Sequence, residues 1–229
     1  MTSAGELESL LESLGTWPNH RDVERALRGG GWEFCGAGDW ATALRSPDGS
    51  AVARVSAFDP VGPFTAALYR EAAGTGQVPK LYVHRRLAGG GDLQLMEWLS
   101  PVTYEDAVGF WQELTSGSSE LAALRHVLQS VHERAQKELP WCGPLDDNPS
   151  NIMRAGNGHL VLTDPFYADG PKLYAAAANT PEIVAARIPR EERRFITEIP
   201  LAASGPWDSE DQEKIRAGLE AADLLLGRQ

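Results

Sequence analysis

The chain has 229 residues, of which 42% are hydrophobic and 23% are charged, as in ordinary globular proteins with one large domain or two lobes. These values exclude a disordered chain, and because no apolar run approaches the ~20 residues that cross a bilayer, we expect no membrane association. The net charge of −11 would repel a phosphate backbone, which argues against a nucleic-acid partner. The N-terminus has no basic segment leading into an apolar one, so we expect a cytoplasmic protein.

Three helices and two strand pairs are predicted in the first hundred residues. Leucines at 7, 10, 11 and 14 form a helical stripe that ends at Gly15, and Asn19 is the expected cap of a second helix that stops in glycines. Turn signals such as SPDG and AGGGD separate runs of aromatic and β-branched residues. The pattern predicts a hairpin over residues 32–58, a helix over 63–74 and a second strand pair over 80–99.

The rest of the chain is mainly helical. Leu121, Leu124, Leu128 and Val131 lie on one face of a predicted long helix, and IMR and LVLT are short strands joined by AGNGH. A last helix is expected in SEDQEKIRAGLEAADLLL. The predicted fold is therefore α+β and bilobal, with a β-rich lobe over residues 1–98 and a reduced helical lobe over 99–229.

Two short motifs in the first lobe have more than one explanation. GAGDWA is a GxGxxA string inside a strand pair, which argues against a dinucleotide site because no helix follows it, and a flexible hairpin tip would explain it equally well. VARV places Arg54 inside an apolar strand, with Glu71 on the next helix. Taken alone, Arg54 and Glu71 are typical of residues on a protein surface.

A third motif, LDDNPSNIMRAGNGHLVLTDPFY, brings Asp146, Asn151 and Asp164 close together in sequence. Carboxylate and amide oxygens suit Mg²⁺, which commonly takes a few protein ligands and fills its other positions with phosphate and water. A metal on Asn151 and Asp164 would leave Asp146 free to orient a hydroxyl for attack on phosphorus. Taken one at a time, the three residues are equally well explained as caps of turns.

Together the three motifs resemble the protein-kinase-like superfamily, which includes the aminoglycoside phosphotransferases. DDNPSNIM is similar to the catalytic-loop pattern DxxxxN, and TDPF stands where the family has its metal-binding DFG-type triplet. The order of a Gly-rich hairpin, a basic strand, VPKLY, NIM and TDP is most similar to the small serine/threonine kinases encoded by bacteriophages. The resemblance covers about residues 32 to 167.

The resemblance implies a role for each matching residue. Asp146 corresponds to the catalytic aspartate that orients the attacking hydroxyl, while Asn151 and Asp164 correspond to the metal ligands. The implied cofactors are ATP and Mg²⁺. Residues implied to contact the nucleotide, or to hold those that do, are Gly36, Gly38 and Trp40 in the glycine-rich loop, Arg54 paired with Glu71, and Glu97 and Trp98 in the hinge strand.

The sequence departs from the family pattern in places. Arg54 replaces the usual lysine, and a planar, forked guanidinium does not simply substitute for a compact ammonium at phosphates. Pro144 stands where the catalytic loop usually has histidine. No APE motif follows TDPF, and NTPE is as well explained by a helix with Pro181 in its first turn. Other candidate sites have ordinary explanations: Cys35 and Cys142 as free thiols, His126 and His132 as ordinary helix residues, and residues 189–194 as solvated surface.

We therefore predict an ATP- and Mg²⁺-dependent kinase that transfers phosphate to a serine or threonine of a protein substrate, in the host cytoplasm if the chain is phage-encoded. Only about fifty residues separate the hinge from the catalytic loop, which leaves little room for the insertion that builds a small-molecule pocket in aminoglycoside enzymes. Such a small-molecule phosphotransferase is one alternative. The other is a pseudokinase that binds nucleotide or docks a protein, which Arg54 favours and the complete set of Asp146, Asn151 and Asp164 opposes.

Overall fold

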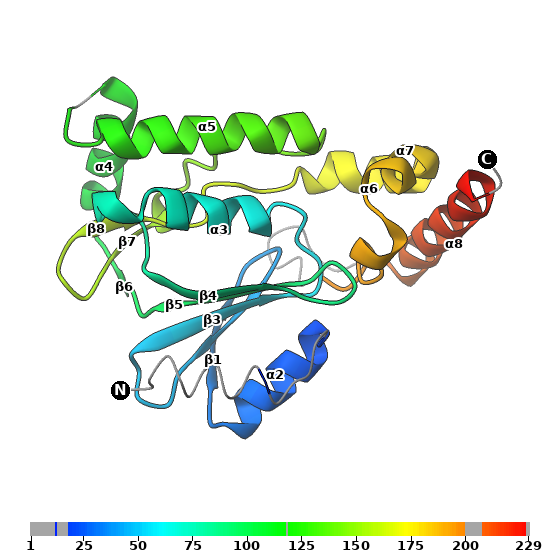
Figure 1. The fold of residues 1–229 in the computed structure, drawn as a ribbon, viewed down its shortest axis with the longest axis horizontal. Coiled ribbons are helices and arrows are strands. Elements are labelled where there is room, and N and C mark those ends of the chain that lie inside the picture. Colours follow the sequence, from blue (N-terminus) through cyan, green and yellow to red (C-terminus); the bar gives the residue numbers. More distant parts are fainter. Residues whose placement is uncertain (1–11, 13–17, 118, 200–207, 228–229) are drawn as a thin grey trace.

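The computed structural model describes residues 12, 18–117, 119–199 and 208–227. Within these residues the chain forms a five-stranded sheet, a small three-stranded sheet and a set of helices (Figure 1). The predicted α+β class is therefore confirmed, and the arrangement is compatible with two lobes. The helix predicted over residues 6–15 lies outside the described residues apart from Glu12. No helix in the described part of the chain is long and apolar enough to cross a membrane.

The large sheet is antiparallel throughout and has the strand order β1-β2-β3-β5-β4. Both predicted strand pairs lie in it. The predicted SPDG turn joins β2 to β3, where Asp48 Oδ1 accepts hydrogen bonds from Ser46 Oγ and from the backbone of Ser50, at 2.7 and 3.1 Å. The strands are β1 (Glu33–Ala37), β2 (Thr42–Arg45), β3 (Ala51–Ser56), β4 (Leu81–Arg86) and β5 (Asp92–Glu97).

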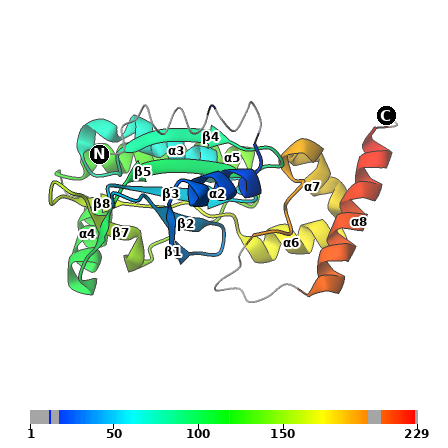
Figure 2. The ribbon, with the colours of Figure 1, turned by 90° about the horizontal axis from the view of Figure 1, so that it is seen from below.

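Helices cover both faces of this sheet. Helix α2 (His20–Gly29) lies on one face, and the side chain of Asn19 caps it as predicted. Helix α3 (Gly62–Glu71) lies on the other face, and α5 (Ala122–Glu138) runs beside α3 on the side away from the sheet (Figure 1). In Figure 2 the same molecule is seen from the α2 side, with α2 in front of the sheet.

The remaining elements lie at the two ends of the molecule (Figure 1). At one end, β6 (Ser100–Pro101), β7 (Ile152–Arg154) and β8 (Leu160–Leu162) form the small sheet beside α4 (Tyr104–Ser116). At the other end lie α6 (Gly170–Asn179), α7 (Pro181–Arg187) and α8 (Ser209–Leu226), and Pro181 starts α7 as expected. Short 3-10 turns lie at Ala73–Thr75, Pro149–Asn151 and Arg190–Glu192.

Two apolar clusters correspond to the two faces of the sheet. The cluster under α2 contains Val23 and Leu27 together with Leu93 and Leu95 of β5. The larger cluster combines α3 with residues of α4 to α8, so α3, from the predicted first lobe, shares its core with the helical part. Leu121, Leu124, Leu128 and Val131 belong to that larger cluster, as their helical spacing predicts.

The turn between β4 and β5 packs closely against residues 192–195. Gly90 has φ +88°, and a Cβ there would lie 1.8 Å from the carbonyl oxygen of Glu192, so only glycine fits. Residues 189–194 were predicted to be solvated surface, and this is wrong for Arg193, which is 4% exposed and donates to the carbonyl of Ile188 at 2.6 Å. The mixed charge of residues 189–194 predicts an exposed segment, but the tertiary structure buries part of it.

Both cysteines are free thiols, as predicted. Cys35 is exposed on β1, whereas Cys142 is partly buried, and burial raises the pKa of the Cys142 thiol to about 11. Burial also raises the pKa of Cys35. The thiolate is the reactive form of cysteine, and a nucleophilic cysteine therefore has a lowered pKa. The pKa values of Cys35 and Cys142 are both raised instead.

Candidate functional site

A cleft of about 1100 Å³ lies between the large sheet and the loop and hairpin that contain Asp146 and Asp164. Its walls include residues of β1, β2, β3 and the end of β5 on one side and of segment 144–167 on the other. All but two of the predicted site residues line it; Glu71 and Glu97 do not. The lining residues that the sequence predicted are Gly36, Gly38, Trp40, Arg54, Trp98, Asp146, Asn151 and Asp164.

Asp146 lies in a loop that is braced by its own polar groups. The backbone N–H of Asp146 donates to the carbonyl of Pro165 at 2.9 Å, which ties this loop to the residue after Asp164. The Asp146 carboxylate accepts from the backbone of Asn148 at 3.1 Å, and Asn148 in turn caps the short 3-10 turn that ends at Asn151. The spacing of Asp146 and Asn151 thus follows from a turn closed by local side-chain caps.

Asp164 follows β8 in an unusual backbone conformation. Its φ is +45°, and among the described residues it is the only non-glycine with a positive φ. Its backbone N–H donates to the hydroxyl of Tyr69 on α3 at 3.0 Å, and the side-chain amide of Asn151 donates to its carbonyl at 3.4 Å. Contacts from both sides of the cleft therefore hold Asp164 in place.

Arg54 lies between two carboxylates. Its Nη1 donates to Oδ2 of Asp59 at 2.7 Å, and its Nε and Nη2 lie 3.3 and 3.2 Å from Oδ2 of Asp164. Burial alone would lower the pKa of Arg54, but Asp164 and Asp59 outweigh it and raise this pKa further above its usual value. Burial raises the pKa of Asp164, and the nearby Arg54 opposes that shift. Arg54 is therefore charged, and its guanidinium forms ion pairs with both carboxylates.

The predicted pairing of Glu71 with Arg54 is wrong. Glu71 is the last residue of α3 and forms an exposed ion pair with Arg134 of α5 at 2.6 Å. Asp59, which is fully buried, takes the predicted place: its Oδ1 accepts the backbone N–H groups of Val61 and Gly62 at the start of α3, and its Oδ2 binds Arg54. The carboxylate that binds Arg54 thus lies just before the first residue of α3 and not at its last residue.

The hinge residues divide between two environments. Trp98 lines the cleft, and the guanidinium of Arg45 lies 4.1 Å from its ring centroid. Glu97, which was predicted to line the same pocket, instead accepts a hydrogen bond from the backbone of Lys80 at 2.8 Å. Met96 and Trp98 line the cleft and Glu97 between them does not, which is the alternation expected of side chains at the end of a strand.

The glycine-rich turn contacts the helical part through Trp40. The Trp40 ring stacks on Tyr174 of α6, with centroids 6.2 Å apart and an angle of 13° between the planes. A Cβ added at Gly36 or Gly38 would meet nothing within 4 Å, so packing inside the protein does not require glycine at either position. The turn therefore closes one end of the cleft and leaves space above its own backbone.

Three residues of this region were not predicted from the sequence: Asp59, Tyr69 and His132. His132 was predicted to be an ordinary helix residue and does lie on α5, but it also has a specific contact that the sequence did not predict: its Nε2 lies 2.8 Å from the carbonyl of Gly143, and its ring stacks on Phe166. From α5 it supports the loop that carries Asp146. The helical spacing of His132 does not indicate this contact. Asp59 could have been found from the sequence, because a polar residue just before a predicted helix often binds the first backbone N–H groups of that helix.

No model of a protein family matches the chain, and no curated protein matches it either. The kinase-like resemblance stays a prediction. What can be said of function depends on the motifs and on the geometry of the cleft.

Proposed function

We propose that the chain is an ATP- and Mg²⁺-dependent phosphotransferase with a kinase-like fold, acting on a serine or threonine hydroxyl of a protein. The observation that supports this most is the meeting of Asp146, Asn151 and Asp164 in the same cleft as the glycine-rich turn and Arg54. Asp146, Asn151 and Asp164 come from one short segment, whereas the glycine-rich turn and Arg54 come from a distant part of the chain: Arg54 and Asp164 are 110 positions apart. If Asp146, Asn151 and Asp164 only capped turns, nothing would require their side chains to line the same cleft as Arg54.

The residues present fit a bound Mg²⁺. Oδ1 of Asp164 is buried and has no hydrogen-bond partner among the described residues, whereas Oδ2 faces Arg54. A buried carboxylate oxygen without a partner is costly, and a cation would relieve that cost. The described residues hold no group of three or more His, Cys, Asp or Glu that could bind a metal. Asn151 and Asp164 would thus be the protein ligands, phosphate oxygens would complete the coordination, and the ion would neutralise charge on those phosphates.

The chain's own residues have distinct tasks in this proposal. The acceptor oxygen attacks the γ-phosphorus, the bond to the leaving ADP oxygen breaks, and the hydroxyl proton passes to Asp146 or to water. Asp146 is suited to orient that hydroxyl, since its loop is fixed by Pro165 and Asn148. The backbone at Gly36 and Gly38 has space to approach phosphate oxygens. His132 and Tyr69 are positioning residues: His132 supports the loop of Asp146, and Tyr69 accepts a hydrogen bond from the backbone of Asp164.

A binding module that holds nucleotide without transferring phosphate is the second candidate. Arg54 favours it, because its guanidinium already binds Asp59 and Asp164 and so has less capacity to bind phosphates. Oδ1 of Asp164 and the placement of Asp146 favour the enzyme. A protein acceptor is preferred over a small molecule because, among the described residues between β6 and the Asp146 loop, α4 and α5 are the only helices.

The test is transfer of labelled γ-phosphate from ATP with Mg²⁺ to the protein itself and to a cell extract. The wild type is compared with Asp146→Asn and Asp164→Asn. Asp147→Asn is the matched control, because this neighbour also lines the cleft but is given no role. We expect transfer by the wild type and by Asp147→Asn, and a loss of about a hundredfold or more in the other two variants.

Binding measurements separate the two candidates. Transfer that survives Asp146→Asn and Asp164→Asn would contradict the proposed chemistry. Absence of transfer, combined with Mg²⁺-dependent ATP binding that Asp164→Asn weakens, would favour the binding module. Absence of ATP binding in the wild type would refute both.

A further inference from the structure

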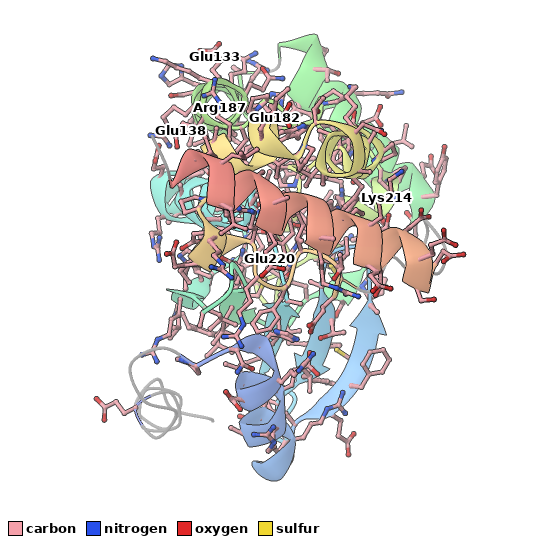
Figure 3. All side chains as sticks on the ribbon, turned by 90° about the vertical axis from the view of Figure 1, so that its right-hand side faces the viewer. Glu133, Glu138, Glu182, Arg187, Lys214 and Glu220 are labelled. Carbon is pink, nitrogen blue, oxygen red and sulfur yellow. The ribbon has the colours of Figure 1, made fainter. Side chains whose placement is uncertain are left out.

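A second cavity, of about 860 Å³, lies at the end of the molecule where α8 crosses the helical part. It is bounded by the β4–β5 turn, by residues 190–196 and by α8, and its walls share no residue with the cleft. Figure 3 looks onto this end, with α8 running across the view and Glu220 labelled along its lower edge. Nothing in the proposed phosphotransfer uses this cavity.

The walls of the cavity are part apolar and are held by close packing. Leu87, Ile196 and Leu219 contribute buried apolar side chains. The turn that carries Gly89 fits against Phe195 so closely that a Cβ at Gly89 would lie 2.3 Å from its ring. Backbone contacts therefore fix the spacing between the turn and residues 190–196, and the cavity is preformed to that extent.

Most of the charged groups in the walls are compensated. Arg193 is bound to Asp223 of α8, and Glu192 is bound by Arg86 at 2.8 and 2.9 Å. Arg190 lies 3.9 Å from Glu220, at the limit of an ion pair. The pairs of Arg190 and Arg193 link residues 190–194 to α8. Two further arginines of the walls, Arg194 and Arg216, are in none of these pairs.

Arg194 and Arg216 have no carboxylate partner among the described residues. The Arg194 guanidinium lies 5.3 Å from the ring centroid of Phe195, and Nη1 of Arg216 donates to the hydroxyl of Thr197 at 3.0 Å. Each guanidinium has five N–H donors, so most of them remain free. Glu191 is the other wall carboxylate outside a described ion pair, and it is exposed. Arg194 and Arg216 are also exposed, so their guanidinium groups are accessible to a ligand at the cavity wall.

We propose that this cavity is a second ligand site, for a small organic anion whose carboxylate or phosphate group binds Arg194 and Arg216. The apolar part of the ligand lies against Leu87 and Leu219. Guanidinium groups bind both kinds of anion through paired hydrogen bonds, and a volume of about 860 Å³ is in the usual range for small-molecule sites. The proposal does not depend on the phosphotransferase activity.

The test is calorimetric titration of the full chain with phenyl phosphate, benzoate and, as a neutral control, benzyl alcohol. The key variant is Arg194→Gln with Arg216→Gln. Its matched control is Arg187→Gln with Lys214→Gln, which removes the same charge from exposed positions on α7 and α8 outside the cavity, both labelled in Figure 3. We expect saturable binding of at least one anion by the wild type and the control, and binding weaker by about tenfold or more in the key variant.

Each result decides the question. Preference for phenyl phosphate or for benzoate identifies the ligand as a phosphate ester or a carboxylate, and either supports the site. No saturable anion binding by the wild type, equal loss in both double variants, or equal binding of benzyl alcohol would overturn it. Arg216→Glu provides a second variant if the double substitution lowers the melting temperature, and it must also abolish binding. Because ATP takes no part in the titration, failure here leaves the proposed function untouched.

Discussion

The two faces of the large sheet differ in what they bury. Toward α2, β3 and β5 present Ala53, Val55, Leu93 and Leu95, and the cluster there is apolar throughout. The opposite face presents Arg54, which pairs in register with Gln94. Strand alternation sorts the two sets, because successive side chains point to opposite faces. The comparison teaches that the face of these strands toward α2 is packed by apolar side chains, while the opposite face combines apolar packing with charged groups at the cleft.

The largest expected effect tests the charged face. Arg54→Met leaves Asp59 fully buried without its cation, so we expect the free energy of unfolding to fall by about 3–5 kcal/mol. Urea unfolding measures it. Arg25→Met is the control, since its ion pair with Asp22 is exposed and is expected to contribute about 0.5 kcal/mol. Equal losses in the two variants would mean that the charged face is no more sensitive than the surface.

The apolar face is tested by Leu95→Ala. Leu95 is fully buried under α2, so its truncation is expected to cost about 3 kcal/mol of stability. Leu225→Ala, on an exposed position of α8, is the control and is expected to cost little. If the faces differ as described, ATP binding by the folded Leu95→Ala variant, measured well below its melting temperature, stays at the wild-type value. Weakened binding would show that the two faces are coupled.

A smaller effect is expected for Tyr69→Phe, which sharpens the comparison at one hydrogen bond. The change removes the oxygen that accepts from the backbone of Asp164 and leaves the apolar packing of the ring in place. We expect a loss of about 1 kcal/mol in urea unfolding. Tyr104→Phe, on a side chain that is 75% exposed, serves as the reference and is expected to change nothing measurable. No difference between the two variants would remove Tyr69 from the residues that position Asp164.

The smallest effect concerns His20, at the start of α2. Burial lowers the pKa of His20 below its ordinary value of 6.5, with Glu198 opposing the shift. As pH falls below about 6.5, the unfolded state therefore binds a proton more readily than the folded state, and stability falls. We expect the wild type to lose at most about 1 kcal/mol more than His20→Phe between pH 7.5 and 5.5. A pH profile identical in both proteins would contradict this.

Local patterns were sufficient to predict much of the fold. The SPDG turn, the Asn19 cap and the leucine spacing of α5 are each determined by residues close in sequence, and all appear where expected. The cleft set of Asp146, Asn151 and Asp164 also came from one short segment. Partners from distant segments were not predictable, because a hydrogen bond such as that between Asp164 and Tyr69 spans 95 positions.

The sequence by itself determined the element types and the presence of one basic residue within an apolar strand. It also determined which residues alternate, and so which could share a face of β3. Only the tertiary structure decided that Asp59 and not Glu71 binds Arg54, and that His132 supports the Asp146 loop. The physical reason is that propensity and capping act over a few residues, whereas ion pairs and cavity walls depend on how α3, α5 and α8 pack.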